Sequence, residues 1–133
     1  HGDDRGYFME TYNENDMKEA GIDVKFVQDN QSMSTKGVLR GLHFQKHFPQ
    51  CKLVRAVRGT VFDAVVDLRQ DSKTYGKWYG VTLSAENKKQ FLIPALRMVS
   101  LFLAMKRNSV TRSTTSGIQT MKAAWPGTIP KSG

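Results

Sequence analysis

The sequence contains a single cysteine, Cys51, among its 133 residues, so no internal disulfide can form. A lone cysteine fits a reducing compartment, and we expect a cytoplasmic protein in which Cys51 is a small buried strand residue. No apolar run approaches the roughly 20 residues that a membrane-spanning helix needs, so no membrane partner is expected. The chain starts at His1 with neither an initiator Met nor a signal-peptide pattern, and we expect it to be a fragment that lacks an N-terminal element.

The sequence signatures of nucleotide cofactors and of several enzyme classes are also missing. There is no P-loop, no G-x-G-x-x-G segment and no Ser/His/Asp signature. His43 and His47 are four residues apart, but on an expected strand and loop rather than on a helix, and no H-x-H pair accompanies them. A His-rich metal site is therefore disfavoured.

Acidic residues are missing from the C-terminal part of the chain. Residues 95–133 hold six of the 20 Lys/Arg and none of the 12 Asp/Glu, and they account for most of the net charge of +8. We therefore divide the chain into residues 1–94, which form the N-terminal part of one domain, and residues 95–133, an aberrant basic tail. Nucleic-acid contact is one explanation for such a tail, although basic charge alone is weak evidence for it.

Short apolar and β-branched runs, separated by turn residues, recur at roughly ten-residue intervals along the first 94 residues, which favours an all-β sandwich or barrel. The runs are 24–29, 38–45, 52–57, 60–68, 77–83 and 88–93. One short helix is expected from Asn13 to Ala20, with Asn13 as its N-cap and Gly21 at its end. In the tail, residues 95–105 are apolar enough for a strand or a helix. Residues 111–116 and 125–133 carry no clear period, which favours a poorly ordered extension.

Polar side chains interrupt the strand predicted at 38–45. Alternation places Arg40 and Leu42 on one face of this strand and His43 and Gln45 on the other. A bulge at Gly41 could bring Arg40 and His43 to the same side.

Lys52, Arg55 and Asp63 lie on adjacent predicted strands, so a pocket that gathers His, Arg and Lys is geometrically possible. Such a pocket suits an anionic ligand and an enolate-type intermediate. From spacing alone, a surface or hydrogen-bonded histidine is the commoner explanation for His43, and both alternatives stay open.

Several ordered motifs narrow this choice. Residues 37–45 read G-V-L-R-G-L-H-F-Q, and residues 52–55 read K-L-V-R. Five further motifs accompany them: D-x-R-G-x-F-x-E at 3–10, F-x-Q-D-N-x-S at 26–32, V-F-D-x-x-V-D-L-R at 61–69, L-S-A-E-N at 83–87 and F-L-I-P at 91–94. Together they resemble, in order, the motifs of the dTDP-4-dehydrorhamnose 3,5-epimerase family. The resemblance covers residues 1–94. It implies a cupin-type jelly-roll β-sandwich or barrel that is incomplete at its C-terminal end.

The resemblance implies an isomerase that inverts C3 and C5 of dTDP-4-dehydro-6-deoxy-D-glucose during dTDP-L-rhamnose biosynthesis. Each inversion needs a base to remove a proton next to the keto group, and an acid to return one on the opposite face. By resemblance His43 is the base, Lys52 lies beside the developing oxyanion, and Asp63 supports the lysine. No metal and no organic cofactor is implied, because the keto group already acidifies the neighbouring C–H bonds.

The same resemblance implies a binding site for the dTDP-linked 4-keto-6-deoxy sugar. Arg40 is expected against the base and the substrate. The substrate-binding set is Arg5, Phe8, Glu10, Gln28, Asn30, Arg40 and Gln45. In this family Arg5 and its neighbours serve the site of the partner subunit, which implies a homodimer.

The resemblance stops after Pro94. The family continues with motifs like R-G-F-A-H-G-F, E-F-x-Y-K and W-N-D-P, which supply a tyrosine acid and the aspartate that orients the catalytic histidine. Reading residues 95–133 one base earlier, with permitted synonymous codons, restores all three motifs in order, so our hypothesis is that the tail is encoded out of frame. We then expect an impaired enzyme with open sheet edges and a tendency to aggregate. The alternative is a non-catalytic sugar-nucleotide or nucleic-acid binding module.

Overall fold

The structure is a computed structural model that describes residues 2–43, 50–94, 98–105 and 108–114, with the backbone alone for 2, 3, 42, 43, 98, 99 and 108–114. The elements are β1 Gly2–Asp3, β2 Gly6–Tyr7, α1 Glu14–Glu19, β3 Gln28–Ser34, β4 Leu39–His43, β5 Lys52–Arg58, β6 Thr60–Asp67, β7 Trp78–Ser84, β8 Gln90–Ile93, β9 Met98–Ala104 and β10 Asn108–Thr114. In this part of the chain no helix has the length and apolar character needed to cross a membrane.

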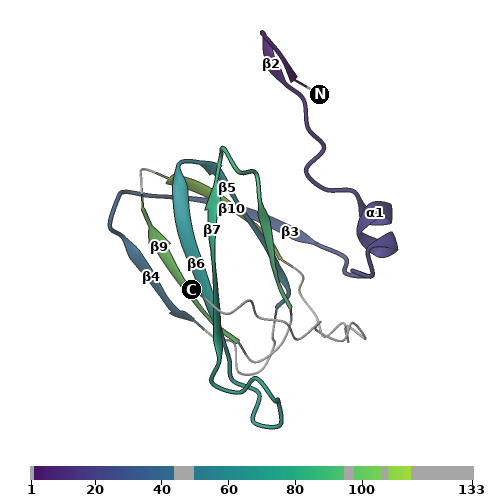
Figure 1. Cartoon of the computed structure of the whole chain (residues 1–133). Helices are drawn as coiled ribbons and strands as arrows, with labels where there is room; N and C mark the ends of the chain where they lie inside the picture. The colour runs from purple at the N-terminus through teal and green to yellow at the C-terminus, as the bar shows by residue number, and fades with distance from the viewer. Residues whose placement is uncertain (1, 44–49, 95–97, 106–107, 115–133) are drawn as a thin grey trace.

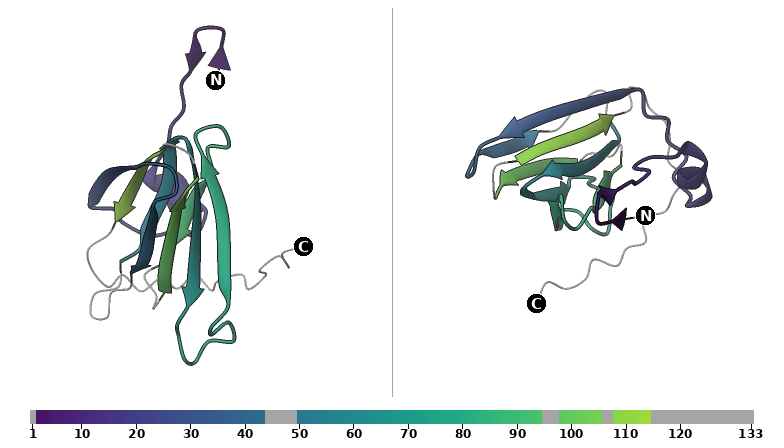
Figure 2. Two further views of the ribbon diagram at one scale, coloured as in Figure 1. Left: turned by 90° about the vertical axis from the view of Figure 1, so that its left-hand side faces the viewer. Right: turned by 90° about the horizontal axis from the view of Figure 1, so that it is seen from above.

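Two four-stranded antiparallel sheets form a sandwich (Figure 1). One sheet has the strand order β3-β10-β5-β8 and the other has the order β4-β9-β6-β7. From β3 to β10, consecutive strands lie in opposite sheets, except β6 and β7, which are neighbours in the same sheet. Seen from above in Figure 2, the strands form two stacked layers. This arrangement confirms the expected all-β jelly-roll fold.

The core lies between the sheets because every second residue of each strand faces inward. Val61 of β6, for example, lies opposite both Leu83 of β7 and Ala104 of β9, and all three are buried. The core cluster consists of Val54, Ala56, Val61, Val65, Leu83, Phe91, Ile93, Phe102 and Ala104. Each large aliphatic or aromatic side chain of this set contributes about 1.5–3 kcal/mol by leaving water.

Most of the predicted elements are present. Strands β4 to β8 match the runs predicted between residues 38 and 93 to within a few residues. The predicted helix is α1, and Asn13 is its N-cap: the Asn13 Oδ1 accepts hydrogen bonds from the backbone N–H groups of Asn15 and Asp16 at 3.0 and 3.4 Å. Cys51, directly before β5, is buried as expected.

The strand predicted at 24–29 is displaced, because β3 begins only at Gln28. The apolar residues before it have other roles: Val24 is buried, and Phe26 packs edge-on against Tyr12 with ring centroids 5.5 Å apart. The sequence of β3 itself is QDNQSMS, and only its last residue, Ser34, is buried. A strand this polar has no apolar alternation, so the sequence pattern favours the apolar residues beside it instead.

Strands β9 and β10 come from the basic tail, yet they occupy inner positions of both sheets. β9 lies between β4 and β6, and β10 lies between β3 and β5. Phe102 and Ala104 of β9 belong to the core. Residues 98–104 therefore form a strand, which is one of the two alternatives, strand or helix, expected for the apolar residues 95–105. The expectation of open edges after residue 94 is wrong for β5 and β6, because β10 and β9 pair with them.

The connection between β6 and β7 is held by the buried carboxylate of Asp67, which is 5% exposed. Its Oδ1 accepts from the backbone N–H and the Nε of Arg69, both at 2.9 Å, and its Oδ2 accepts from Arg69 Nη2 at 2.7 Å. The hydroxyls of Ser72 and Thr74 donate to the same Oδ2 at 2.8 and 2.6 Å. The Arg69 guanidinium, aided by these hydroxyls, holds the pKa of Asp67 well below its usual range, against the opposing effect of burial.

Residues 2–13 form an arm that leaves the sandwich (Figure 1). At its tip β1 and β2 pair as a short antiparallel hairpin, with Asp3 opposite Gly6. Figures 1 and 2 both show this hairpin beyond the end of the sheets. The arm carries exposed aromatic side chains: Tyr7 is 64% exposed and Phe8 is 79% exposed.

Candidate functional site

Polar residues occupy the inward face of the β4-β9-β6-β7 sheet, where a sandwich normally places apolar residues. Asp63 is two residues from Val61 and two from Val65, so it shares the inward face of β6 with these core residues. It is 1% exposed. Arg40 of β4 and Asp63 of β6 both lie opposite Phe102 of β9, and directly opposed residues in antiparallel strands lie on the same face. Arg40 and Asp63 therefore flank Phe102 on the inner side of this sheet.

The register between β4 and β9 shifts between Arg40 and His43. Arg40 lies opposite Phe102, whereas His43 lies opposite Ser100, two residues further along β9. From Arg40 to His43 the chain advances three residues along β4, whereas the opposite strand advances only two. Phe102 and Ser100 share a face of β9, so the positions of Arg40 and His43 also fall on one face. This is the bulge that the sequence suggested.

Glycine at position 41 permits this bulge. A Cβ atom on Gly41 would lie 2.6 Å from Leu101 Cδ1, 3.1 Å from Leu101 Cα and 3.2 Å from the carbonyl oxygen of Ser100. Real Cβ atoms do not approach neighbours this closely, and part of the contact is with backbone that cannot rotate away. The close approach of β4 to β9 thus requires a residue without a side chain.

Arg40 connects the two sheets. Its Nε donates a 2.9 Å hydrogen bond to the Oγ of Ser34 on β3, and its Nη2 donates to the Met33 carbonyl oxygen at 3.3 Å. Ser34 is buried, at 6% exposure. These bonds fix the guanidinium across the side of the sandwich where the edge strands β3 and β4 lie. Sequence reasoning did not identify Ser34, because a serine at the end of a polar strand carries no signal of its own.

The facing sheet contributes amides and a lysine. Gln28 of β3 and Lys52 of β5 both lie opposite Thr114 of β10, and Lys52 shares the inward face of β5 with Val54. Lys52 is half-buried. Gln28 Nε2 donates a 3.2 Å hydrogen bond to Asn30 Oδ1, two residues along the same face of β3. The positions of Gln28, Asn30 and Lys52 thus lie on the inner surface of one sheet, and those of Arg40, His43 and Asp63 lie on the inner surface of the other.

The predicted residues of the arm are not brought to this location. Arg5 lies between β1 and β2, and Phe8 and Glu10 follow on the exposed arm. Glu10 Oε1 accepts a 3.3 Å hydrogen bond from Asn13 Nδ2, close to the start of α1. Gln45 lies outside the described residues, and for His43 the backbone alone is described.

The two inner surfaces combine a buried carboxylate, Asp63, with the cationic groups of Lys52 and Arg40. Arg40 is exposed and Lys52 is half-buried. Cations held in place beside a ligand site bind anionic groups and can stabilise a developing oxyanion. A base at the position of His43 would lie on the same face as Arg40. The arrangement suits proton removal next to a carbonyl in an anionic ligand. In the described part of the chain, no three His, Cys, Asp or Glu side chains gather in a way that could hold a metal ion.

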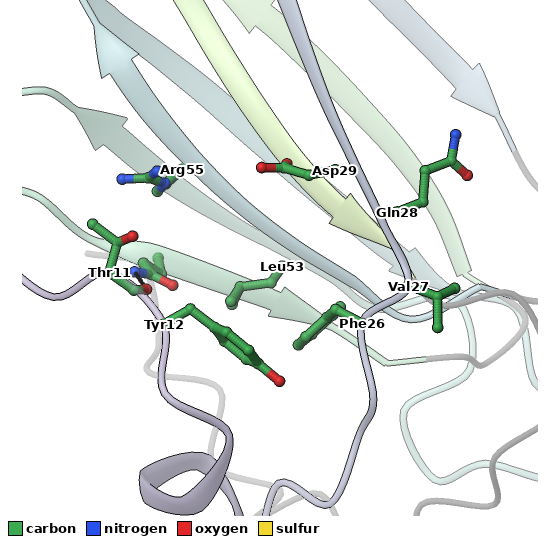
Figure 3. Close-up of a pocket in the computed structure, with 9 residues that line it drawn as sticks. Thr11, Tyr12, Phe26, Val27, Gln28, Asp29, Leu53 and Arg55 are labelled. Atoms are coloured by element: carbon green, nitrogen blue, oxygen red, sulfur yellow. Dashed lines mark hydrogen bonds between the residues drawn. The ribbon is translucent and has the colours of Figure 1, made fainter.

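A pocket of about 310 Å³ lies on the other side of the β3-β10-β5-β8 sheet (Figure 3). It is lined by Thr11, Tyr12, Phe26, Val27, Gln28, Asp29, Leu53, Arg55 and Gln90. Arg55 is three residues from Lys52 on a regular strand, which puts it on the outer face. The expectation that Arg55 joins Lys52 and Asp63 is therefore wrong. Figure 3 shows Leu53 near the side chains of Tyr12 and Phe26.

Comparison with known proteins gives a consistent result. The family model described as dTDP-4-dehydrorhamnose 3,5-epimerase matches residues 1–121, beyond the boundary at residue 94. A protein of that name from Methanothermobacter thermautotrophicus is 63% identical over 92 residues, covering 69% of this chain and 50% of the relative. Another from Sinorhizobium fredii is 47% identical over 111 residues, covering 82% of this chain and 56% of the relative.

Solved structures show the same similarity. The dTDP-6-deoxy-D-glucose-3,5-epimerase of Legionella pneumophila in complex with dTDP-4-keto-L-rhamnose superposes with a TM-score of 0.82 at 42% identity, covering 90% of this chain and 64% of that chain. The dTDP-4-dehydrorhamnose 3,5-epimerase of Elizabethkingia anophelis gives a TM-score of 0.78 at 45% identity, covering 88% and 65%. The chain thus spans about half the length of the curated relatives that it matches.

Proposed function

Because the chain belongs to the dTDP-4-dehydrorhamnose 3,5-epimerase family, we propose that the polar positions between its sheets bind a dTDP-linked 4-keto-6-deoxy sugar for epimerisation at C3 and C5. The observation that supports this most strongly is the register of the sheet, which places the strand positions of Arg40, His43 and Asp63 on one inward face. The guanidinium of Arg40 and the ammonium of Lys52 are cations that suit an anionic ligand. The Legionella pneumophila relative, whose structure holds dTDP-4-keto-L-rhamnose, supports this class of ligand.

In the proposed mechanism His43 removes the proton next to the keto group. The ammonium of Lys52 stabilises the enolate oxygen that develops as the C–H bond breaks. Asp63 keeps a compensating negative charge near the lysine, and Arg40, tied to Ser34, positions the diphosphate and the base. An acid on the opposite face of the sugar then returns a proton to the carbon, which inverts its configuration.

The arm extends the proposal to a second subunit. Arg5, Phe8 and Glu10 lie on an exposed arm, so they cannot complete the inter-sheet site of their own chain in this arrangement. We propose that they contribute to the nucleotide site of a partner chain in a homodimer. An exposed aromatic such as Phe8 then becomes buried against the partner, as aromatic residues at interfaces commonly are.

The tail limits the proposed activity. In the frameshift hypothesis the tyrosine acid and the aspartate that orients His43 are encoded out of register after Pro94. Loss of one proton-transfer group lowers the rate by about 10²–10⁴-fold. The chain as written is therefore proposed to bind the sugar nucleotide and to epimerise it poorly. A cytoplasmic location, expected from the single Cys51, is part of the same proposal.

Calorimetric titration with dTDP tests the binding site. We expect saturable binding that weakens by about tenfold or more, or about 1.4 kcal/mol, in Lys52→Met and in Arg40→Met. Lys77→Met, at an exposed lysine before β7, is the matched control and should bind as the unaltered chain does. Absence of dTDP binding by the unaltered chain would refute the proposal. Salt-sensitive DNA binding in its place would favour the nucleic-acid binding alternative.

A further inference from the structure

The turn between β7 and β8 contacts the arm. The Nζ atom of Lys88 lies over the ring of Tyr7 at 3.7 Å from the ring centroid, within the range of a cation–π interaction. Tyr7 ends the hairpin strand β2, directly before Phe8. The contact therefore fixes the outer part of the arm relative to the sandwich.

The backbone of this turn is held in one conformation. Asn87 Oδ1 accepts hydrogen bonds from the backbone N–H groups of Ser84 and Lys89, both at 3.0 Å, and Asn87 Nδ2 donates to the Thr82 carbonyl oxygen at 2.9 Å. Lys88 has a φ of 53°, in the left-handed region that few non-glycine residues adopt. The Asn87 bonds hold the backbone on both sides of Lys88 in this conformation.

A second contact holds the inner end of the same arm segment. Gln90, the first residue of β8, donates a 2.6 Å hydrogen bond from Nε2 to the backbone carbonyl of Thr11. Beside it Tyr12 packs edge-on against Phe26. Thr11, Tyr12 and Gln90 all line the pocket on the outer face of this sheet, so the bond joins the arm root to the sheet at the pocket.

Between these two contacts, residues 8–10 remain exposed, with Phe8 at 79% and Met9 at 38%. We propose that Lys88 and Gln90 are positioning residues: they clamp the arm at Tyr7 and Thr11 and so aim Phe8 and Glu10 at the nucleotide site of a second copy of this chain. The inference rests on the proposed function, because it assumes that the arm serves a partner's dTDP site. A clamped arm loses less conformational entropy when it closes over a ligand, which raises affinity without a new ligand contact.

Binding of dTDP to the full chain tests this proposal. Lys88→Gln keeps much of the side-chain length and removes the charge. We expect the Kd for dTDP to rise about 3–10-fold in this variant, because the arm is no longer preorganised for binding. Gln90→Ala should act in the same direction. Lys88→Arg retains the cation over the Tyr7 ring and should restore the unaltered affinity. Lys89→Gln, at an exposed lysine of the same turn, is the matched control.

Amide hydrogen exchange of residues 7–11 supplies a readout that a purely structural role would not change. With dTDP bound, we expect slow exchange in the unaltered chain, in Lys88→Arg and in Lys89→Gln, and fast exchange in Lys88→Gln and Gln90→Ala at unchanged thermal stability. Equal affinity and equal arm protection in all variants would overturn the positioning role alone. Absence of dTDP binding by the unaltered chain would overturn the proposed function, and this inference with it.

Discussion

Arg40 and Ser34 join the two sheets of the sandwich through a 2.9 Å hydrogen bond from the guanidinium Nε to the serine Oγ. One residue belongs to β4 and the other to β3, the neighbouring edge strands of opposite sheets. The bond holds a cation beside the row that contains Asp63, and it does so before any ligand arrives. The affinity of the site for an anion should therefore depend on a serine that itself carries no charge.

Ser34→Ala tests this dependence. Removing a hydrogen bond to a charged partner costs about 1.5–3 kcal/mol when the partner is buried. The cost is smaller here because Arg40 is exposed and keeps the Met33 carbonyl as an acceptor. We expect the Kd for dTDP to rise about 3–10-fold, with little change in unfolding free energy. Thr82→Ala, which removes an exposed hydroxyl on β7, should leave the Kd unchanged. An unaltered Kd in Ser34→Ala would show that Arg40 needs no such anchor.

Gly41→Ala should damage both stability and binding. The added Cβ would meet the Cα and Cδ1 of Leu101, so β4 must move away from β9. Overpacking of this kind costs about 1–3 kcal/mol, and here it also separates Arg40 from the face of His43. Chemical denaturation and dTDP calorimetry measure the two effects.

Gly76→Ala is the control for that variant. Gly76 has a φ of 75°, and a Cβ added there would meet no atom within 4 Å, so alanine strains the backbone by about 1–2 kcal/mol without touching the site. It should lower stability and leave dTDP affinity intact. If Gly41→Ala behaved in the same way, the bulge would have no part in binding.

Asp67→Asn should lower the unfolding free energy at pH 7 by about 2–3 kcal/mol, because the charged partner of Arg69 and of two hydroxyls is lost inside the protein. The folded-state pKa of Asp67 is depressed, so its contribution is fully present above the unfolded value of about 3.9 and is lost as the pH falls below it. The stability of the unaltered chain should thus decline below about pH 4, and Asp67→Asn should lack that part of the slope.

Urea denaturation between pH 2 and pH 7 measures this difference, with Asp71→Asn as the control. Asp71 lies in the same connection but is exposed. Its substitution should leave both the stability at pH 7 and the acid slope close to those of the unaltered chain. An equal loss in both variants would contradict the role given to the Asp67 network.

Local signals in the sequence predicted the parts of the fold that depend on neighbouring residues. The Asn13 cap and the apolar run of β6 are properties of a few consecutive residues, and the sequence predicts both. The bulge at Gly41 could be suggested because a glycine interrupts an odd spacing of polar residues.

The parts that were missed depend on distant or polar contacts. Strands β3 and β10 lack apolar alternation, and their neighbours in the sheets define them instead. Gln90 and Thr11 are 79 residues apart, so no local pattern could predict their hydrogen bond. Arg55 is absent from the site because a three-residue spacing from Lys52 on a regular strand reverses the face, and adjacency of predicted strands alone does not show this.

We propose that these sheets form a dTDP-sugar site whose proton-returning groups are encoded out of frame after Pro94. The direct test is deuterium incorporation at C3 and C5 of the dTDP-linked 4-keto sugar in heavy water, followed by NMR. It compares the chain as written with a chain whose residues 95–133 are re-encoded one base earlier. We predict that both bind dTDP and that the re-encoded chain exchanges at least about 100-fold faster. Equal exchange rates in the two chains would contradict the account.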